Sequence, residues 1–166
     1  WTNNSDRWKL AATTDGNNFL YHADDNAPGV DLYKDTVYTA PIIVPVTTDG
    51  SVWKLGFDQR NSYMYTYVGG PRHDVSISND GGATWDSAWV ASNASFTSLT
   101  PVEPIDLSVY AGDTIHVAFV HHGDFDTAWR IDNIRITKFY DPILSAMIPD
   151  FPATAIGDTS VRMMQV

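Results

Sequence analysis

The chain has 166 residues, of which 43% are hydrophobic and 13% aromatic, a composition typical of one globular domain with its own core. Its net charge of −10 argues against a nucleic-acid partner, because phosphates would be repelled. The absence of cysteine excludes disulfides, thiolate chemistry and cysteine-bound zinc, and it favours a bacterial over a eukaryotic secreted module. The sequence has no apolar run long enough to span a bilayer as a helix.

Short β-type runs separated by Gly, Asn, Asp and Pro follow one another along the chain, and helical periodicity is nearly absent. Apolar and polar residues alternate in most of these runs, as in strands with one buried face. In chain order, the predicted strands are 19–21, 37–46, 53–58, 74–78, 114–119 and 133–137. Pro41 and Pro45 confine the second run to a sheet edge or break it. Many short strands at this spacing predict an all-β sandwich or barrel.

Residues 78–85 fit the Asp-box pattern S-x-D-x-G-x-T-W over its full length. In such a turn the Asp80 side chain can accept backbone N–H bonds, the glycines supply positive φ, and Trp85 packs back over the hairpin. The pattern resembles the repeated boxes of sialidases, which are structural and come several to a chain. A propeller would need several repeats. Because this chain has one box, we expect a β-hairpin and not a sialidase.

Three motifs in the second half follow this hairpin in a characteristic order. Residues 106–112 read D-L-S-V-Y-A-G, residues 115–121 read I-H-V-A-F-V-H, and residues 131–136 read I-D-N-I-R-I. They resemble the cleaved-adhesin and choice-of-anchor J families, which are relatives of MAM domains, and the resemblance covers residues 1–138. It implies a jelly-roll β-sandwich on a secreted or surface protein of bacteria, or an accessory module of a secreted hydrolase. Family members usually have a further strand ahead of the position of Trp1, so we expect a first strand to be missing or supplied by a partner segment.

The composition changes after Phe139, where Tyr140-Asp141-Pro142 opens a stretch punctuated by proline. This stretch is typical of a linker followed by the opening strand of an Ig-like β domain. A C-terminal tail packed on the sandwich is the alternative. We therefore expect a jelly-roll domain over residues 1–139, and a linker with the start of a next domain, or a packed tail, over residues 140–166.

Asp132 is the first candidate for a metal ligand. It alternates with Ile134 and Ile136, so a period of two puts its carboxylate on their face of the strand. A carboxylate on the core side needs a partner or a metal, because an unpaired buried charge is costly. The alternatives are hydrogen bonds from backbone N–H groups, an ion pair with Arg130, or a bulge that turns the side chain outward.

The family resemblance implies a structural calcium ion at this place, because relatives bind calcium near the position of Asp132 together with residues of an early strand. By that match Asn18 is the early-strand ligand, and Asp24 and Asp25 follow as loop ligands. Carboxylates and carbonyls supply the oxygens that calcium prefers. The sequence has no EF-hand loop pattern.

Tyr63, Tyr65 and Tyr67 fall on one side of any extended strand. Such a row could stack on sugar rings or form a protein contact surface. Ordinary cross-strand packing on a half-buried face is the alternative. We therefore name these three tyrosines as candidate ligand-binding residues.

No catalytic pattern such as G-x-S-x-G, H-E-x-x-H or a P-loop occurs in the sequence. His121 and His122 are neighbours in a predicted strand, so they point to opposite faces and cannot chelate one ion without a bulge. We expect a non-catalytic adhesion or binding module of a bacterial surface or secreted protein, which recognises a glycan or a protein. The alternative is a structural spacer or accessory domain that stabilises a secreted hydrolase or peptidase. Neighbouring domains of the same polypeptide are expected partners, whereas nucleic acid and direct membrane insertion are not.

Overall fold

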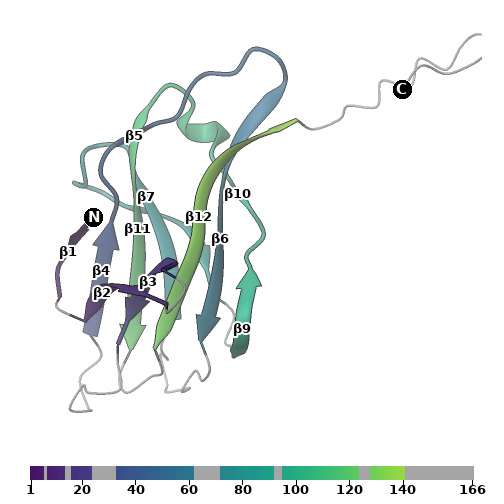
Figure 1. The fold of residues 1–166 in the computed structure, drawn as a ribbon. Helices are drawn as coiled ribbons and strands as arrows, with labels where there is room; N and C mark the ends of the chain where they lie inside the picture. Colours follow the sequence, from purple (N-terminus) through teal and green to yellow (C-terminus); the bar gives the residue numbers. More distant parts are fainter. Residues whose placement is uncertain are drawn as a thin grey trace, which may run out of the picture.

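The computed structural model describes residues 1–5, 7–13, 16–23, 33–61, 72–91, 95–123 and 128–140. These residues form two antiparallel sheets and one short 3-10 helix (Figure 1). None of the helical structure in this part of the chain has the length and hydrophobicity needed to cross a bilayer.

In the first sheet the described strands follow the order β1–β4–β11–β7–β8, with β5 beside β11. They are β1 (Thr2–Asn3), β4 (Tyr33–Tyr38), β5 (Ile42–Ile43), β7 (Arg72–Ser78), β8 (Asp86–Val90) and β11 (Thr114–Gly123). The break between β4 and β5 contains Pro41, which cannot donate to a ladder. The predicted interruption of the run 37–46 is therefore confirmed.

In the second sheet the order is β10–β6–β12–β3–β2, with β9 beside β6. Its described strands are β2 (Trp8–Ala12), β3 (Asn18–His22), β6 (Ser51–Asn61), β9 (Phe96–Pro101), β10 (Ile105–Asp106) and β12 (Trp129–Tyr140), and helix η1 (Ser108–Tyr110) follows β10. Successive strands such as β3 and β4, β6 and β7, and β11 and β12 lie in opposite sheets. This repeated crossing between layers is jelly-roll topology and confirms the predicted all-β sandwich.

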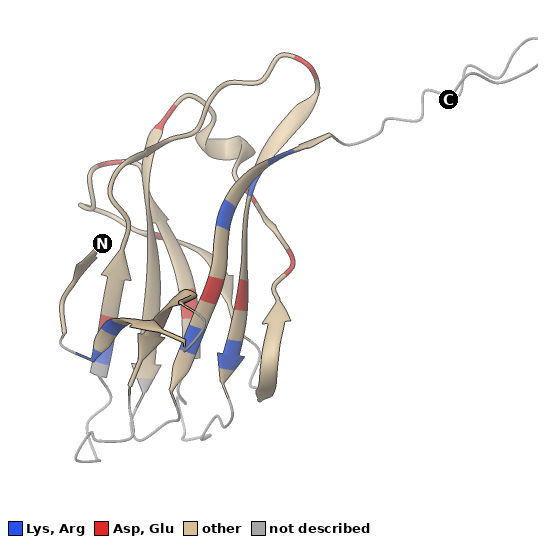
Figure 2. Ribbon diagram, viewed as in Figure 1, with Lys and Arg blue, Asp and Glu red and all other residues tan. Residues whose placement is uncertain are grey.

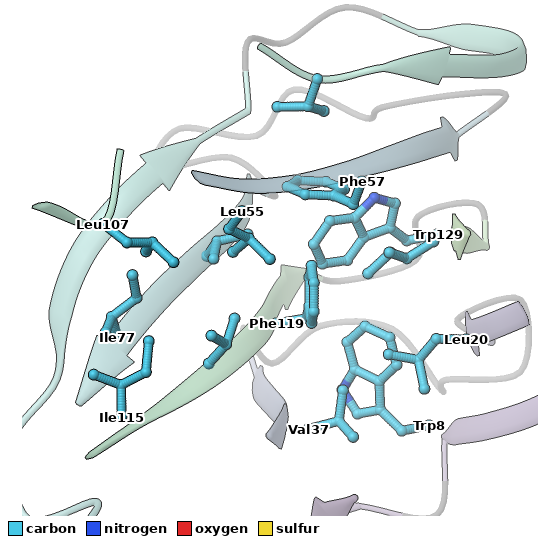
Figure 3. Packing of buried hydrophobic residues seen from close by; sticks show 14 of the residues in the cluster. Trp8, Leu20, Val37, Leu55, Phe57, Ile77, Leu107, Ile115, Phe119 and Trp129 are labelled. Atoms are coloured by element: carbon cyan, nitrogen blue, oxygen red, sulfur yellow. The ribbon is translucent and has the colours of Figure 1, made fainter. Parts of the chain in front are cut away.

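The core between the sheets has an aromatic half and an aliphatic half (Figure 3). In the aromatic half, Phe57 of β6 packs edge-on against Phe119 of β11, with 5.3 Å between ring centroids, and Trp129 lies 6.0 Å from Phe119. Such edge-to-face contacts are the preferred geometry of aromatic pairs. The aliphatic half contains the fully buried side chains of Leu55, Ile77, Leu107 and Ile115.

The Asp-box segment joins β7 to β8 and forms the predicted hairpin. The backbone N and the hydroxyl of Thr84 donate to the Asp80 carboxylate over 2.9 and 2.7 Å. Trp85 Nε1 donates to the carbonyl of Gly82 over 3.1 Å, which folds the indole back over the turn. Gly81 and Gly82 have φ of 75° and 92°, values that a side chain would strain.

Strand β12 contains a bulge directly after Asp132, where its ladder with β6 shifts register. Asn133 takes up the extra residue with φ 52°, in the left-handed region that Asn tolerates. Ile131 is fully buried before the bulge, and Ile134 and Ile136 pack against the core after it. The expectation that Asp132 shares the face of Ile134 and Ile136 is therefore wrong, because the bulge puts it out of phase with them.

Three fully buried histidines lie between the sheets, one each from β3, β7 and β11. The rings of His22 and His121 stack at 4.0 Å across the two sheets, and His73 stacks on Trp129 at 4.2 Å with 5° between the planes. His22 Nε2 lies 2.8 Å from the buried Asp35 carboxylate. The histidine side chains thus serve mainly as flat packing elements of the aromatic half of the core.

Burial is the main reason why the pKa of His73 lies well below its ordinary value, and the nearby histidines, first His121, then His22 and His122, lower it further. Neither ring nitrogen of His73 has a hydrogen-bond partner among the described residues. The folded state therefore holds this imidazole neutral, whereas the unfolded chain protonates it near pH 6.5.

We predict that acid weakens the fold before any carboxylate titrates. The lowered pKa of His73 means that the unfolded state binds more protons below about pH 6.5, so stability falls as the pH drops from there to the folded-state pKa. The slope is about 1.4 kcal/mol per pH unit for one such group. Urea unfolding between pH 7.5 and pH 4.5 measures it, and the lowered pKa of Asp35 acts only at still lower pH.

His73→Phe keeps a flat ring on Trp129 and cannot bind a proton, so it should flatten this pH dependence. His116→Gln, at a part-buried histidine that contacts the carbonyl of Thr39, is the control and should leave the slope in place. An unchanged slope in His73→Phe would assign the acid sensitivity to other groups.

Candidate ligand-binding site

The outer face of the second sheet carries aromatic side chains on β3. Leu20 and His22 are buried, so strand alternation directs Phe19 and Tyr21 to the opposite, outer face, where both are half-buried. Their rings meet edge-on with centroids 6.2 Å apart and an interplanar angle of 85°. They form two apolar walls at right angles to each other.

A row of basic side chains crosses the same face at the level of Tyr21. Lys9 of β2 pairs with Tyr21, Tyr21 pairs with Arg130 of β12, and Arg130 pairs with Arg60 of β6. Because directly opposed residues project from the same face of a sheet, these four side chains are lateral neighbours. Figure 2 shows the basic segments of β12 and β6 side by side near one end, with an acidic segment above each of them. In register, the acidic pair is Asp132 and Asp58.

Arg130 is held in place by two contacts. Its guanidinium carbon lies over the Phe19 ring, 3.8 Å from the centroid, a cation–π arrangement. Its Nη2 donates to Asp132 Oδ2 over 2.8 Å, and the two side chains are 19% and 4% exposed. The arginine that Asp132 was predicted to pair with as an alternative to metal is therefore its partner in the structure.

These residues enclose two adjoining hollows. One, of about 260 Å³, is lined by Phe19, Tyr21, Arg60, Ala128 and Arg130. The other, of about 330 Å³, is lined on its polar side by Asn17, Asn18, Asp132 and Asn133. Phe19 lines both. The second hollow is also lined by Leu20, Ile131 and Ile134, which belong to the core or pack against it. Apolar and hydrogen-bonding groups therefore lie close together around Phe19, as they do in ligand sites.

A further hollow of about 290 Å³ lies towards the other end of the sandwich, against the segment that follows β5, the start of β6, and η1. Val44, Trp53 and Leu107 line it, and no ionisable side chain does. It lacks charged groups that would orient a ligand, so the outer face of the second sheet is the stronger candidate.

The structure brings two of the predicted calcium ligands together, because Asn18 and Asp132 line the same hollow. Asp24 and Asp25 lie outside the described residues, and so do Tyr63, Tyr65 and Tyr67. The loop ligands and the tyrosine row stay predictions.

The described atoms around Asp132 do not fit a cation. Its Oδ2 accepts from Arg130 and, over 3.3 Å, from Asn17 Nδ2, while its Oδ1 accepts from the backbone N of Asn133 over 2.8 Å. A calcium ion would have to replace the guanidinium that already neutralises the carboxylate. Within the described ranges no group of three or more His, Asp or Glu is placed to hold a metal. The calcium prediction, which also depends on Asp24 and Asp25, stays a prediction.

Sequence reasoning did not identify Phe19, Tyr21 and Arg60 as site residues, and it named Arg130 only as a partner of Asp132. The alternation of two aromatics with Leu20 in β3 was a visible signal of an aromatic outer face. The row of cations was not visible, because it depends on the pairing register of four strands that are far apart in the sequence.

We predict that Asp132→Asn destabilises the domain by about 1.5–3 kcal/mol, the usual contribution of a hydrogen bond to a charged group. The substitution keeps the shape of the side chain but leaves Arg130 without its counter-ion. Urea unfolding measures the loss. Asp58→Asn, at the more exposed carboxylate opposite, is the control and should cost less.

The Asp132→Asn variant also tests whether this carboxylate binds calcium. A wild-type melting temperature that rises with calcium and falls with a chelator, together with loss of that response in Asp132→Asn, would show that this carboxylate holds a metal. That result would contradict the assignment of Arg130 as its partner.

The comparisons with known proteins show the fold. No protein-family model matches the chain, and no curated protein is significantly similar to it. Solved structures with a similar fold include the carbohydrate-binding module TmCBM61 in complex with β-1,4-galactotriose, with a TM-score of 0.50 and 11% identity, covering 83% of this chain and 86% of that one. A family 6 carbohydrate-binding module has a TM-score of 0.49 and 13% identity, covering 84% and 88% of the two chains.

The K3 cleaved adhesin domain of Lys-gingipain from Porphyromonas gingivalis W83 is also similar, with a TM-score of 0.49 and 16% identity, covering 81% of this chain and 93% of that one. At these identities the likeness shows the β-sandwich architecture alone. The chain is an all-β sandwich, the architecture that TmCBM61 also has.

Proposed function

We propose that this domain is a non-catalytic binding module that recognises a glycan on the outer face of its second sheet. The observation that carries the proposal is the set of Phe19, Tyr21, Arg60 and Arg130 around one hollow. Aromatic rings offer flat apolar surfaces for the C–H faces of sugar rings. Guanidinium groups offer several N–H donors for hydroxyl oxygens. A site for a polar ring needs both kinds of group within a few ångströms.

The site is built on strands, which supports a binding role. β12 pairs with β6 on one side and with β3 on the other, so the backbone under Tyr21, Arg130 and Arg60 is fixed by ladders. Arg130 is further fixed by Phe19 and Asp132. A ligand that binds such a preorganised surface loses little affinity to the ordering of side chains.

The carboxylates of this face have structural partners, which supports the non-catalytic part of the proposal. Asp132 accepts from Arg130, and Asp58 accepts from Asn133 Nδ2 over 2.7 Å. The proposal also places the domain on a bacterial surface or in a secreted protein. The motif resemblance to cleaved adhesins supports this placement, and TmCBM61, similar in fold, is a glycan-binding example of the sandwich.

We predict that Tyr21→Ala weakens glycan binding by roughly 30-fold, the effect of losing about 2 kcal/mol at a central aromatic contact. Affinity electrophoresis measures this loss in gels that each contain one member of a panel of soluble polysaccharides, neutral and charged. Tyr140→Ala is the matched control, because Tyr140 is exposed at the far end of β12 and lines none of the hollows on this face.

If Tyr21→Ala keeps the wild-type affinity, the glycan does not bind on the outer face of the second sheet. Failure to bind any polysaccharide of the panel would contradict the proposal and favour the structural-spacer alternative.

A further inference from the structure

We infer that the ligand of this site is an anionic glycan, one whose sugar rings carry carboxylate or sulfate groups; this inference rests on the proposed glycan-binding function. The chain has 20 acidic and only 10 basic residues, so positive charge is scarce. Three of the ten cations, Lys9, Arg130 and Arg60, nevertheless stand at one level of one sheet face. Tyr21 stands between Lys9 and Arg130 in that row.

The positions of the two arginines lower the stability of the folded domain. Arg130 and Arg60 are directly opposite each other in the ladder between β12 and β6, and like charges at such positions destabilise a sheet. Asp132 neutralises Arg130, whereas Arg60 makes no hydrogen bond or ion pair with any residue that the structure describes. The nearest carboxylate on the same face of β6 is that of Asp58, and it accepts a hydrogen bond from Asn133. An anion bound at Arg60 would remove the repulsion and supply the missing partner.

Part of the donor set of this pair is available to a ligand. A guanidinium has five N–H donors. In Arg130, Nη2 donates to Asp132 and Nε is buried, whereas no hydrogen bond of the Arg60 guanidinium to a described residue uses its donors. Arg60 is exposed and lines the hollow together with Arg130. Arginine binds carboxylate and sulfate-like oxyanions through paired, parallel N–H bonds, which are about twice as strong as neutral hydrogen bonds. Two neighbouring arginines therefore favour a charged group over a sugar hydroxyl.

The aromatic walls indicate that the anion belongs to a sugar. A free inorganic anion needs donors alone, but Phe19 and Tyr21 add two apolar surfaces at 85° beside those donors. A rigid ring with a carboxylate or sulfate substituent satisfies both kinds of surface at once. The flexible carboxylate side chain of an acidic peptide can accept hydrogen bonds from the arginines, but it offers no flat apolar surface to pack against the aromatic rings. The geometry therefore favours the anionic glycan over the acidic peptide.

The experiment compares polymers that differ only in charge. Affinities are measured by isothermal titration calorimetry with a chelator present, so that calcium cannot bridge protein and polymer. The polymers are polygalacturonate and its fully methyl-esterified form, together with dextran sulfate and dextran. Poly-glutamate is measured alongside them as the acidic peptide. We expect at least one anionic polymer to bind about tenfold more tightly than its neutral counterpart. The polymer that binds better identifies the group as carboxylate or sulfate.

Arg60→Gln is the decisive variant, because this exposed side chain has no described partner whose loss would disturb the fold. It should lower the affinity for the charged polymer by about tenfold and that for the neutral polymer by clearly less, so that the preference for the charged polymer is lost. Lys54→Gln is the matched control. It makes the same change in net charge on the same face of β6, six residues away or about 20 Å along the strand.

The outcomes separate this inference from the proposed function. Equal affinity for charged and neutral polymers, unaffected by Arg60→Gln but reduced by Tyr21→Ala, would overturn the inference and leave the glycan-binding function standing. Absence of binding to all four polymers would overturn both. Binding of poly-glutamate with the same dependence on Arg60, and of no polysaccharide, would also overturn both and identify an acidic peptide as the ligand.

Discussion

The bulge at Asn133 is the constraint on which the rest of this structure depends. β12 pairs with β6 and β3 at once, so its register fixes both neighbours. Before the bulge, Trp129 and Ile131 enter the core and Arg130 and Asp132 face outward; after it, Ile134 enters the core. Without the extra residue, a strict alternation would put Ile134 on the outer face with Asp132. One residue with positive φ therefore lets the same strand complete the core and hold a largely buried ion pair on its opposite face.

Core and candidate site are two faces of the same strands. On β3, His22 belongs to the buried aromatic half of the core while Tyr21 belongs to the outer row. On β12, Trp129 stacks on His73 while Arg130 covers Phe19. The residues before and after Tyr21 and Arg130 are packed tightly in the core. The backbone that carries these outer side chains is therefore held rigidly. The described side chains of the proposed site are therefore held in place by strands.

The sequence was sufficient for the elements with a clean period of two. The strands at 53–58, 74–78 and 114–119, the break near Pro41 and the Asp-box hairpin are all present. β2 was not predicted, because only Trp8 in it is buried and Leu10 is 67% exposed, so its hydrophobic pattern is lost. Strict alternation placed Asp132 on the wrong face, and the bulge that was left open as an alternative is present. The sequence could not decide between the two, because a bulge leaves no mark in the pattern beyond an asparagine that tolerates positive φ. The basic row could not be predicted at all, since a cross-strand register is a property of the folded sheet.

Asp132 connects the cation and the anion hypotheses for this surface. A cation bound at its carboxylate would take the place of Arg130, release that guanidinium from its partner, and leave two opposed arginines without a described counter-ion. The Arg130 pair and a calcium ion thus compete for the same oxygens, and the first keeps Arg130 over Phe19, where it shapes the hollow. In the arrangement that the structure has, the Asp132 carboxylate positions the Arg130 guanidinium. The proposed anion site and the predicted cation site therefore depend on the same ion pair: the first needs it intact and the second needs it broken.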